Sequence, residues 1–293
     1  MSGNGFAEAA EANGGSSSLR SLPSFFVIGP PRTGTSWLHG VLSQCTWLSH
    51  PTKETRFFDK HFDRGLDWYR SHYRRATNGR VIGEVAPTYF ASPQARERIA
   101  GLIPHAKVVC IFRNPVDRII SLYRVKRAYG FMSWSFEEAL DRDPELMESS
   151  RYAEHLKAWR ETFGESQVMA TVHDDIQADP QSYFDRIVDF VGAQRQKLLP
   201  SQLNRVFGSE EMTEPRHYYW TRGGLLMAEW AKKRRLDSFV ARAKRFGAFK
   251  LFLGGGAAFE QLPAGQRATL RERFRPEVEE LEAVLNRDLS AWK

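Results

Sequence analysis

The stretch FFVIGPPRTGTSWL, residues 25–38, joins a run of apolar residues to a loop rich in glycine, proline and hydroxyl side chains. Residues 25–28 are typical of a buried β-strand, and apolar residues at helical spacing follow from Leu38 onward, so a helix is expected to begin near Thr35. A helix N-terminus presents unpaired N–H groups and the positive end of its dipole, which together bind phosphate. The order of strand, loop and helix therefore predicts a phosphate-binding loop.

The loop departs from the pattern G-x-x-x-x-G-K-[ST] of nucleotide hydrolases. Gly29, Gly34 and Ser36 fit that pattern, but Thr35 occupies the lysine position. Arg32 supplies a positive charge from within the loop, and an arginine fork binds oxyanions in a different geometry from a lysine. The loop is therefore not expected to hydrolyse ATP. The alternative is an ordinary strand-to-helix turn whose glycines serve only the bend.

Short apolar runs and helix-like stretches alternate along the chain. This alternation predicts an α/β fold with a mainly parallel central sheet flanked by helices. The length of 293 residues suits one large domain, placed at residues 23–293. Residues 1–22, rich in Gly, Ala and Ser, are expected to form a disordered tail. The expected strands are residues 25–28, 81–84, 107–112 and 167–172.

The net charge of +7 indicates an anionic partner. Basic residues concentrate in the segment 225–253, which we expect to be helical and which could contact an anionic membrane or a polyanion. The alternative is a basic helix that packs on the domain and is merely exposed to solvent. The chain has two cysteines, Cys45 and Cys110, too few for a disulfide framework, and this suits a reducing compartment.

Residues 31–38, PRTGTSWL, resemble the motif P-[KR]-x-G-T-[ST]-x-[LF] of sulfotransferases that use 3'-phosphoadenosine 5'-phosphosulfate (PAPS). The likeness is greatest to the glycosaminoglycan-type and bacterial members. The resemblance implies a P-loop-like nucleotide-binding fold and a loop that grips the 5'-phosphosulfate of the donor. The residues implied in donor binding at this loop are Arg32, Thr33, Gly34, Thr35, Ser36 and Trp37.

A second phosphate site is implied by the stretch VVCIFRNPVDRIISLY, residues 108–123, which resembles the family's 3'-phosphate site. By that match, Arg113 at the end of a strand and Ser121 on the following helix would hold the 3'-phosphate. Open α/β sheets bind ligands beyond the carboxyl ends of their strands, where Arg113 is expected. Alternatively, Arg113 and Asp117 form a surface ion pair and Ser121 only packs.

The segment KETRFFD, which begins at Lys53, resembles a segment of the glycosaminoglycan sulfotransferases in which the glutamate is the catalytic base. This implies that Glu54 is the base and that Lys53 lies near the reacting groups, with Arg32 also acting on the departing phosphate. Burial by the phenylalanines at 57–58 would raise the pKa of Glu54. The alternatives are a solvated Glu54 paired with a neighbouring cation, and His61 as the base.

Two further matches are weaker. GEVAPTYF, residues 83–90, resembles the family's G-E-x-[ST]-P-x-Y, although some glycosaminoglycan enzymes have lysine at the position of Val85. Arg216 follows a proline where relatives often carry Pro-Arg near the donor phosphates, which implies a donor contact. The plain alternatives are a buried strand with a turn, and a surface arginine.

These observations favour an enzyme of the PAPS-dependent sulfotransferase type. It would transfer a sulfuryl group to a hydroxyl, or less readily an amine, of a carbohydrate, a lipid or another small acceptor. We expect no metal, because no His/Cys cluster has ligand spacing, no nucleic-acid partner, and a cytoplasmic protein that could lie at a membrane surface. The alternatives are an ATP-dependent P-loop kinase and a non-catalytic protein that binds anionic surfaces.

Overall fold

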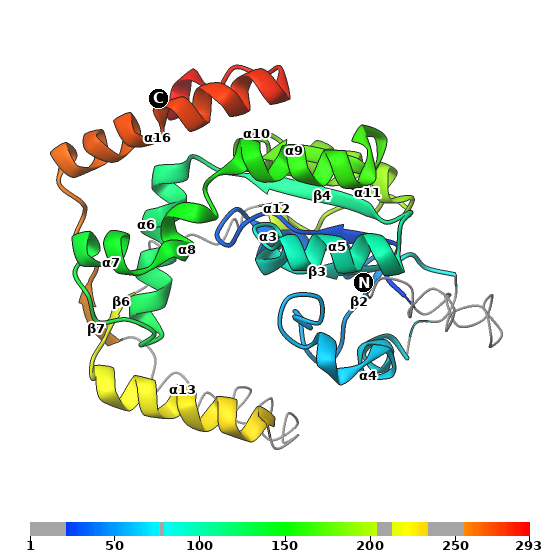
Figure 1. The fold of residues 1–293 in the computed structure, drawn as a ribbon, viewed down its shortest axis with the longest axis horizontal. Helices are drawn as coiled ribbons and strands as arrows, with labels where there is room; N and C mark the ends of the chain where they lie inside the picture. The colour runs from blue at the N-terminus through cyan, green and yellow to red at the C-terminus, as the bar shows by residue number, and fades with distance from the viewer. Residues whose placement is uncertain (1–21, 75, 77–78, 204–212, 234–254) are drawn as a thin grey trace, which may run out of the picture. The chain divides into compact units, whose positions relative to one another are not determined.

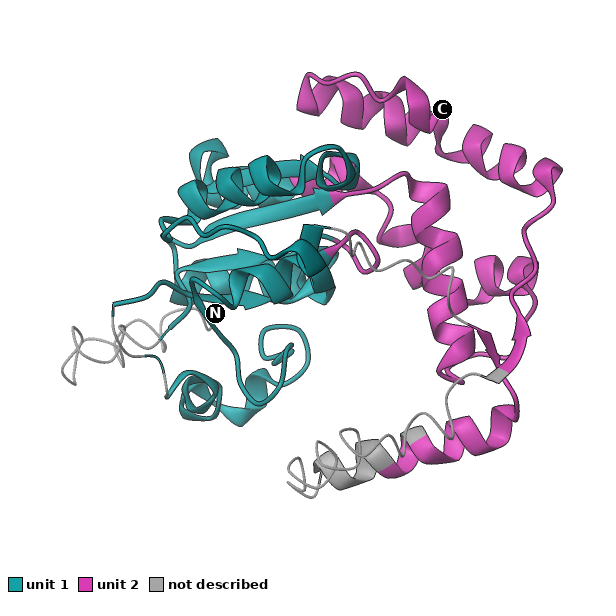
Figure 2. Cartoon of the chain, turned by 180° about the vertical axis from the view of Figure 1, so that it is seen from behind, with its two compact units in different colours: residues 1–29, 35–111, 158–205 teal, residues 30–34, 112–157, 206–293 magenta. Residues whose placement is uncertain are grey.

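The computed structural model describes residues 22–74, 76, 79–203, 213–233 and 255–293. Contacts group the chain into two compact units whose segments alternate along the sequence (Figure 2). The tail expected at residues 1–22 lies outside the described residues except for Leu22. A single domain at residues 23–293 stays a prediction. Unit 1 comprises residues 1–29, 35–111 and 158–205, and unit 2 comprises residues 30–34, 112–157 and 206–293.

A five-stranded sheet forms the centre of unit 1 (Figure 1). Its strand order is β2-β3-β1-β4-β5, and β1 pairs in parallel with both β3 and β4. The predicted fold class, a mainly parallel sheet flanked by helices, is confirmed. The short strand β2 was not expected from the sequence, because two residues are too few to show a periodic pattern. The strands are β1 (Phe25–Val27), β2 (Trp47–Leu48), β3 (Ile82–Val85), β4 (Lys107–Phe112) and β5 (Val168–Val172).

Burial explains why these runs form central strands. All three residues of β1 are fully buried, as are the five residues of β4 from Val108 to Phe112. Gly83 of β3 lies where a Cβ atom would fall 2.0 Å from the ring of Phe25. Only glycine at position 83 leaves room for the Phe25 ring where β1 pairs with β3, so close packing here requires both Phe25 and Gly83.

The helices follow the predicted apolar stripes. Ser92 caps α5 by accepting a hydrogen bond from the amide of Ala95, and Asp179 caps α11 in the same way. The helices that lie in unit 1 or enter it are α3 (Thr35–Leu42), α4 (Leu66–Arg70), α5 (Pro93–Leu102), α9 (Tyr152–Phe163), α10 (His173–Ala178), α11 (Pro180–Val191) and α12 (Pro200–Leu203).

Unit 2 is built around α6 (Pro115–Ala128), which begins with an Asn114 cap and Pro115 at its first position. Ile119 on α6 shares a buried apolar cluster with Phe136 and with Phe274 of the closing helix. The remaining elements are α7 (Phe136–Arg142), α8 (Pro144–Glu148), β6 (Thr213–Pro215), α13 (Tyr218–Lys233), β7 (Gly255–Ala258) and α16 (Ala264–Leu285).

The basic segment predicted at 225–253 is described only in part. Residues 225–233 belong to α13, as expected for a helical segment, and residues 234–253 lie outside the described residues. Among the residues that the structure describes, none of the helices has the length and apolar character needed to cross a membrane.

Candidate active site

The loop between β1 and α3 is held in a tight conformation. At Gly29 a Cβ atom would lie 2.6 Å from the backbone nitrogen of Ile111, so the loop leaves the sheet where only glycine fits. Arg32 has a positive φ of 78°, which is uncommon for a residue with a side chain, and Gly34 has a φ of 100°. The buried Thr33 hydroxyl donates a hydrogen bond to the carbonyl of Pro30 over 2.8 Å. Strain of this kind persists where the surroundings enforce it, and it is common at functional sites.

Unit 2 brings three of the predicted donor-binding residues together in what we call the Arg32 cluster: Arg32, Arg113 and Ser121. The Nε of Arg32 donates to the buried Oγ of Ser121 over 3.0 Å. Arg113 Nη1 donates to the backbone carbonyl of Arg32 over 3.3 Å. Arg32 and Ser121, which are 89 positions apart in the chain, thus meet through the Arg32 side chain.

The Arg32 cluster has an excess of positive charge. Burial, together with the nearby charge of Arg113, lowers the pKa of Arg32. Within the described part of the chain, neither Arg32 nor Arg113 forms an ion pair with a carboxylate. Asp117, the alternative partner of Arg113, pairs with Arg267. Two neighbouring guanidinium groups without a counter-ion repel one another, and a bound phosphate would relieve this repulsion.

The position of Arg113 follows from the chain order of β4 and α6. The strand ends at Phe112, so Arg113 stands at its carboxyl end, as predicted. Asn114 then accepts hydrogen bonds from the amides of Val116 and Asp117 and starts α6, whose second turn carries Ser121. The end of β4 and the helix α6 thus present the Arg113 guanidinium and the Ser121 hydroxyl to the loop, and these two groups suit the binding of a phosphate.

Unit 1 brings together Ser36, Lys53 and Glu54. The Nζ of Lys53 donates to Ser36 Oγ over 3.0 Å and lies 3.5 Å from Glu54 Oε1. Ser36 is exposed near the start of α3, where a hydroxyl and an ammonium group can both reach a ligand. Lys53 and Glu54 therefore lie close to Ser36, a predicted donor-binding residue, within unit 1.

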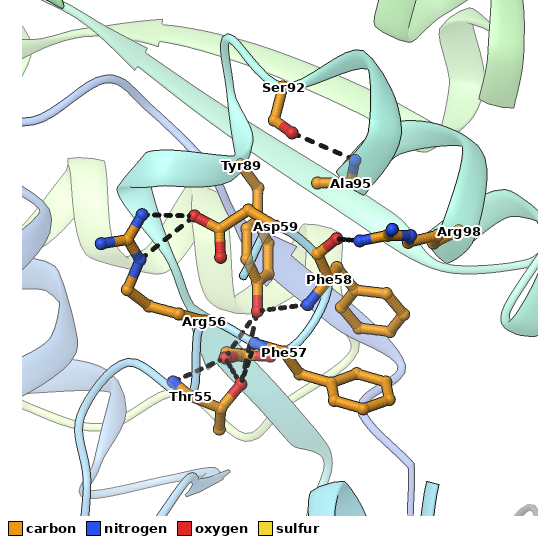
Figure 3. A network of polar contacts seen from close by, with 10 residues as sticks. Thr55, Arg56, Phe57, Phe58, Asp59, Tyr89, Ser92, Ala95 and Arg98 are labelled. Carbon is orange, nitrogen blue, oxygen red and sulfur yellow. Dashed lines mark hydrogen bonds and ion pairs between the residues drawn. The ribbon is translucent and has the colours of Figure 1, made fainter. Parts of the chain in front are cut away.

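The environment of Glu54 favours its neutral form. Burial raises the pKa of Glu54, although the charges of Lys53 and Arg56 oppose the shift. Phe57 and Phe58, which follow it in the chain, are fully buried. The Nε and Nη2 of Arg56 both donate to Oδ2 of Asp59, over 3.1 Å and 2.8 Å (Figure 3). Glu54 thus pairs with Lys53 but is not a freely solvated carboxylate, because only 30% of its side chain is exposed.

The other predicted site residues are placed as follows. Thr35 is buried, and so is Trp37, whose Nε1 donates to the carbonyl of Gln202 over 2.9 Å. Arg216 is exposed directly after β6. His61 is half-buried, and burial lowers its pKa. The roles of these residues stay predictions.

The GEVAPTYF stretch carries one acidic residue for which the motif resemblance implies no role. Glu84, in the GEVAPTYF stretch, is fully buried and accepts hydrogen bonds from Thr55, Tyr69 and Tyr89. The available signal was a single glutamate in the otherwise apolar strand β3. A buried carboxylate needs such partners, so its presence in a strand indicates a polar network.

Comparisons with known proteins identify the family of this chain. The family model described as "Sulfotransferase domain" matches residues 22–217. Heparan sulfate glucosamine 3-O-sulfotransferase 6 of Mus musculus is 30% identical over 184 residues, which cover 60% of this chain and 54% of that protein. Bifunctional heparan sulfate N-deacetylase/N-sulfotransferase 3 of Homo sapiens is 29% identical over 199 residues, 58% of this chain and 22% of that protein.

A solved structure shows the same fold. The crystal structure of a sulfotransferase from Alicyclobacillus acidocaldarius matches with a TM-score of 0.65 and 22% identity, and covers 92% of this chain and 98% of that one. The chain spans about half or less of the length of the curated relatives. The family model extends over both compact units, and its match confirms the predicted family resemblance. The chain belongs to the sulfotransferase domain family.

Proposed function

We propose that this chain transfers a sulfuryl group from PAPS to a hydroxyl group, with a carbohydrate as the favoured acceptor. The observation that carries the proposal is the Arg32 cluster: Arg32 donates to the buried Ser121 hydroxyl, Arg113 donates to the Arg32 carbonyl, and among the described residues neither guanidinium pairs with a carboxylate. A donor with a 5'-phosphosulfate and a separate 3'-phosphate supplies the missing negative charges. Family membership supports the choice of this donor over other polyphosphates.

On the donor side, Arg113 and Ser121 would bind the 3'-phosphate. The loop residues Arg32 to Ser36 would bind the 5'-phosphosulfate with N–H groups, hydroxyls and one guanidinium. When the sulfuryl group leaves, negative charge develops on the phosphate oxygen that bridged it to sulfur. Fixed positive groups stabilise that charge in the transition state, and this is how Arg32 and Lys53 would accelerate the reaction.

On the acceptor side, Glu54 would act as the general base. The acceptor oxygen attacks sulfur, the bond between sulfur and the bridging oxygen breaks, and the acceptor proton passes to the Glu54 carboxylate. The products are a sulfate ester and 3'-phosphoadenosine 5'-phosphate. Burial raises the pKa of Glu54 and so brings its proton affinity nearer to that needed at neutral pH.

The acceptor class rests on the relatives and on charge. The relatives named above modify heparan sulfate, an acidic carbohydrate, and this chain carries a net charge of +7. A basic protein attracts such an acceptor at long range. A carbohydrate hydroxyl is therefore the favoured acceptor, and a carbohydrate amine or a lipid hydroxyl comes second.

Donor choice and transfer can be tested separately. Calorimetry with 3'-phosphoadenosine 5'-phosphate, ATP and duplex DNA, first in a chelating buffer and then with added magnesium, should show binding of the first ligand alone. Incubation with sulfur-labelled PAPS and desulfated or partly sulfated glycans should then label the glycan. Magnesium-dependent preference for ATP would instead identify a kinase, and salt-sensitive DNA binding without nucleotide preference would identify an anion-surface binder.

A further inference from the structure

Glu84 lies beneath the segment that carries Glu54. Its Oε1 accepts hydrogen bonds from the Thr55 amide over 3.0 Å, the Thr55 hydroxyl over 2.5 Å and the Tyr89 hydroxyl over 3.2 Å. Its Oε2 accepts a hydrogen bond from the Tyr69 hydroxyl over 2.6 Å. A carboxylate can only accept hydrogen bonds, and all four contacts use it in that way.

Two of the three hydroxyls that donate to Glu84, those of Thr55 and Tyr89, also accept hydrogen bonds from the backbone that follows Glu54 (Figure 3). The Phe57 amide donates to Thr55 Oγ1 over 3.2 Å, and the Phe58 amide donates to the Tyr89 hydroxyl over 3.4 Å. When the proton of either hydroxyl points at Glu84, the lone pairs of the hydroxyl oxygen face the backbone amide that donates to it. One carboxylate thus orients, directly or through a hydroxyl, three amides between Thr55 and Phe58.

We propose that Glu84 is a positioning residue for Glu54: through Thr55 and Tyr89 it fixes the backbone that follows Glu54, and so holds the base in place. The inference rests on the proposed role of Glu54. Thr55 is the next residue in the chain, so a shift of its amide moves Glu54 directly. Displacement of a catalytic group by about 1 Å can cost on the order of 100-fold in rate.

Burial fits a network that must remain intact. Glu84 is 0% exposed and Thr55 is 4% exposed, so water cannot replace a lost partner. Burial raises the pKa of Glu84, and the hydrogen bonds from Thr55, Tyr69 and Tyr89 oppose that rise. An unsatisfied group at this depth is costly, so removal of one donor should rearrange the segment.

The test compares two buried threonines of unit 1. Thr55→Val removes the hydroxyl that joins Glu84 to the Phe57 amide, and Thr55→Ser retains that hydroxyl. Thr171→Val is the matched control, because Thr171 is 6% exposed and its hydroxyl contacts the Cys110 carbonyl and the Tyr183 hydroxyl. Glu84→Gln is the direct variant, and the threonine variants keep the test valid if that protein fails to fold.

Two readouts do not depend on activity. Amide hydrogen exchange at Phe57 and Phe58 should accelerate roughly tenfold in Thr55→Val and stay near the wild-type rate in Thr55→Ser and Thr171→Val. Carboxyl NMR titration, with the Glu54 signal assigned from Glu54→Gln, should show the raised pKa of Glu54 falling toward its ordinary value in Thr55→Val alone.

In the transfer assay, Thr55→Val should lower kcat roughly tenfold or more and leave the KM for PAPS unchanged. The positioning role is overturned if Thr55→Val matches Thr171→Val in exchange and in the Glu54 titration. The exchange and titration results test the positioning role even if the wild-type protein transfers no sulfuryl group. Absence of transfer by the wild type would instead reject the proposed function.

Discussion

Substitution of Arg113 by alanine separates ligand binding from stability. In the structure Arg113 makes a long hydrogen bond of 3.3 Å to the Arg32 carbonyl and repels the Arg32 guanidinium. Its loss should therefore leave the free energy of unfolding of the free protein unchanged or slightly raised. A guanidinium–phosphate hydrogen bond contributes about 1.5–3 kcal/mol, so the dissociation constant for 3'-phosphoadenosine 5'-phosphate should rise roughly 10- to 150-fold.

Thermal denaturation with and without the nucleotide measures both effects. At a concentration 100 times the wild-type Kd the nucleotide should stabilise the wild type by about 2.7 kcal/mol, and after a hundredfold loss of affinity by only about 0.4 kcal/mol. Arg151→Ala is the charge-matched control, because Arg151 is an exposed residue of unit 2 that pairs with Glu148 and Glu154. Wild-type affinity in Arg113→Ala, or an equal loss in Arg151→Ala, would refute the assignment of the 3'-phosphate site.

Four further outcomes are expected. Glu54→Gln should abolish transfer but retain nucleotide affinity in calorimetry. Because burial raises the pKa of Glu54, its carboxylate is disfavoured in the folded wild type at pH 7 to 8, so this variant should also match or exceed the wild-type melting temperature there. In wild type, kcat should rise with pH through the raised pKa of Glu54, so the acidic limb of the pH–rate profile should lie above the ordinary glutamate range; a limb within that range would exclude Glu54 as the base. Ser121→Ala removes the acceptor for Arg32 Nε, and calorimetry should show roughly two- to tenfold weaker nucleotide binding, from about 0.5–1.5 kcal/mol. Gly29→Ala places a Cβ atom against the backbone of Ile111 and should lower the free energy of unfolding by about 1–3 kcal/mol in urea denaturation; an unchanged midpoint would contradict the close approach.

The local elements and their chemistry can be predicted from the order of residues along the chain. The apolar run at 25–28 and the following glycines predicted the first strand and the phosphate loop, because burial and backbone freedom are properties of consecutive residues. Asn114 and Pro115 are likewise a local pattern, an N-cap followed by a proline at the first helical position, and the structure has that helix from Pro115 to Ala128. Motif resemblance identified the family, which the family model confirmed.

Tertiary structure decided which side chains meet. The contact of Arg32 with Ser121, and the choice of Arg267 rather than Arg113 as the partner of Asp117, join residues far apart in the chain. Neither contact can be read from spacing, because each depends on how strands and helices pack. Glu84 shows the same limit: its position in β3 is evident from sequence, but its four hydrogen bonds come from three other elements or loops that converge only in the folded unit.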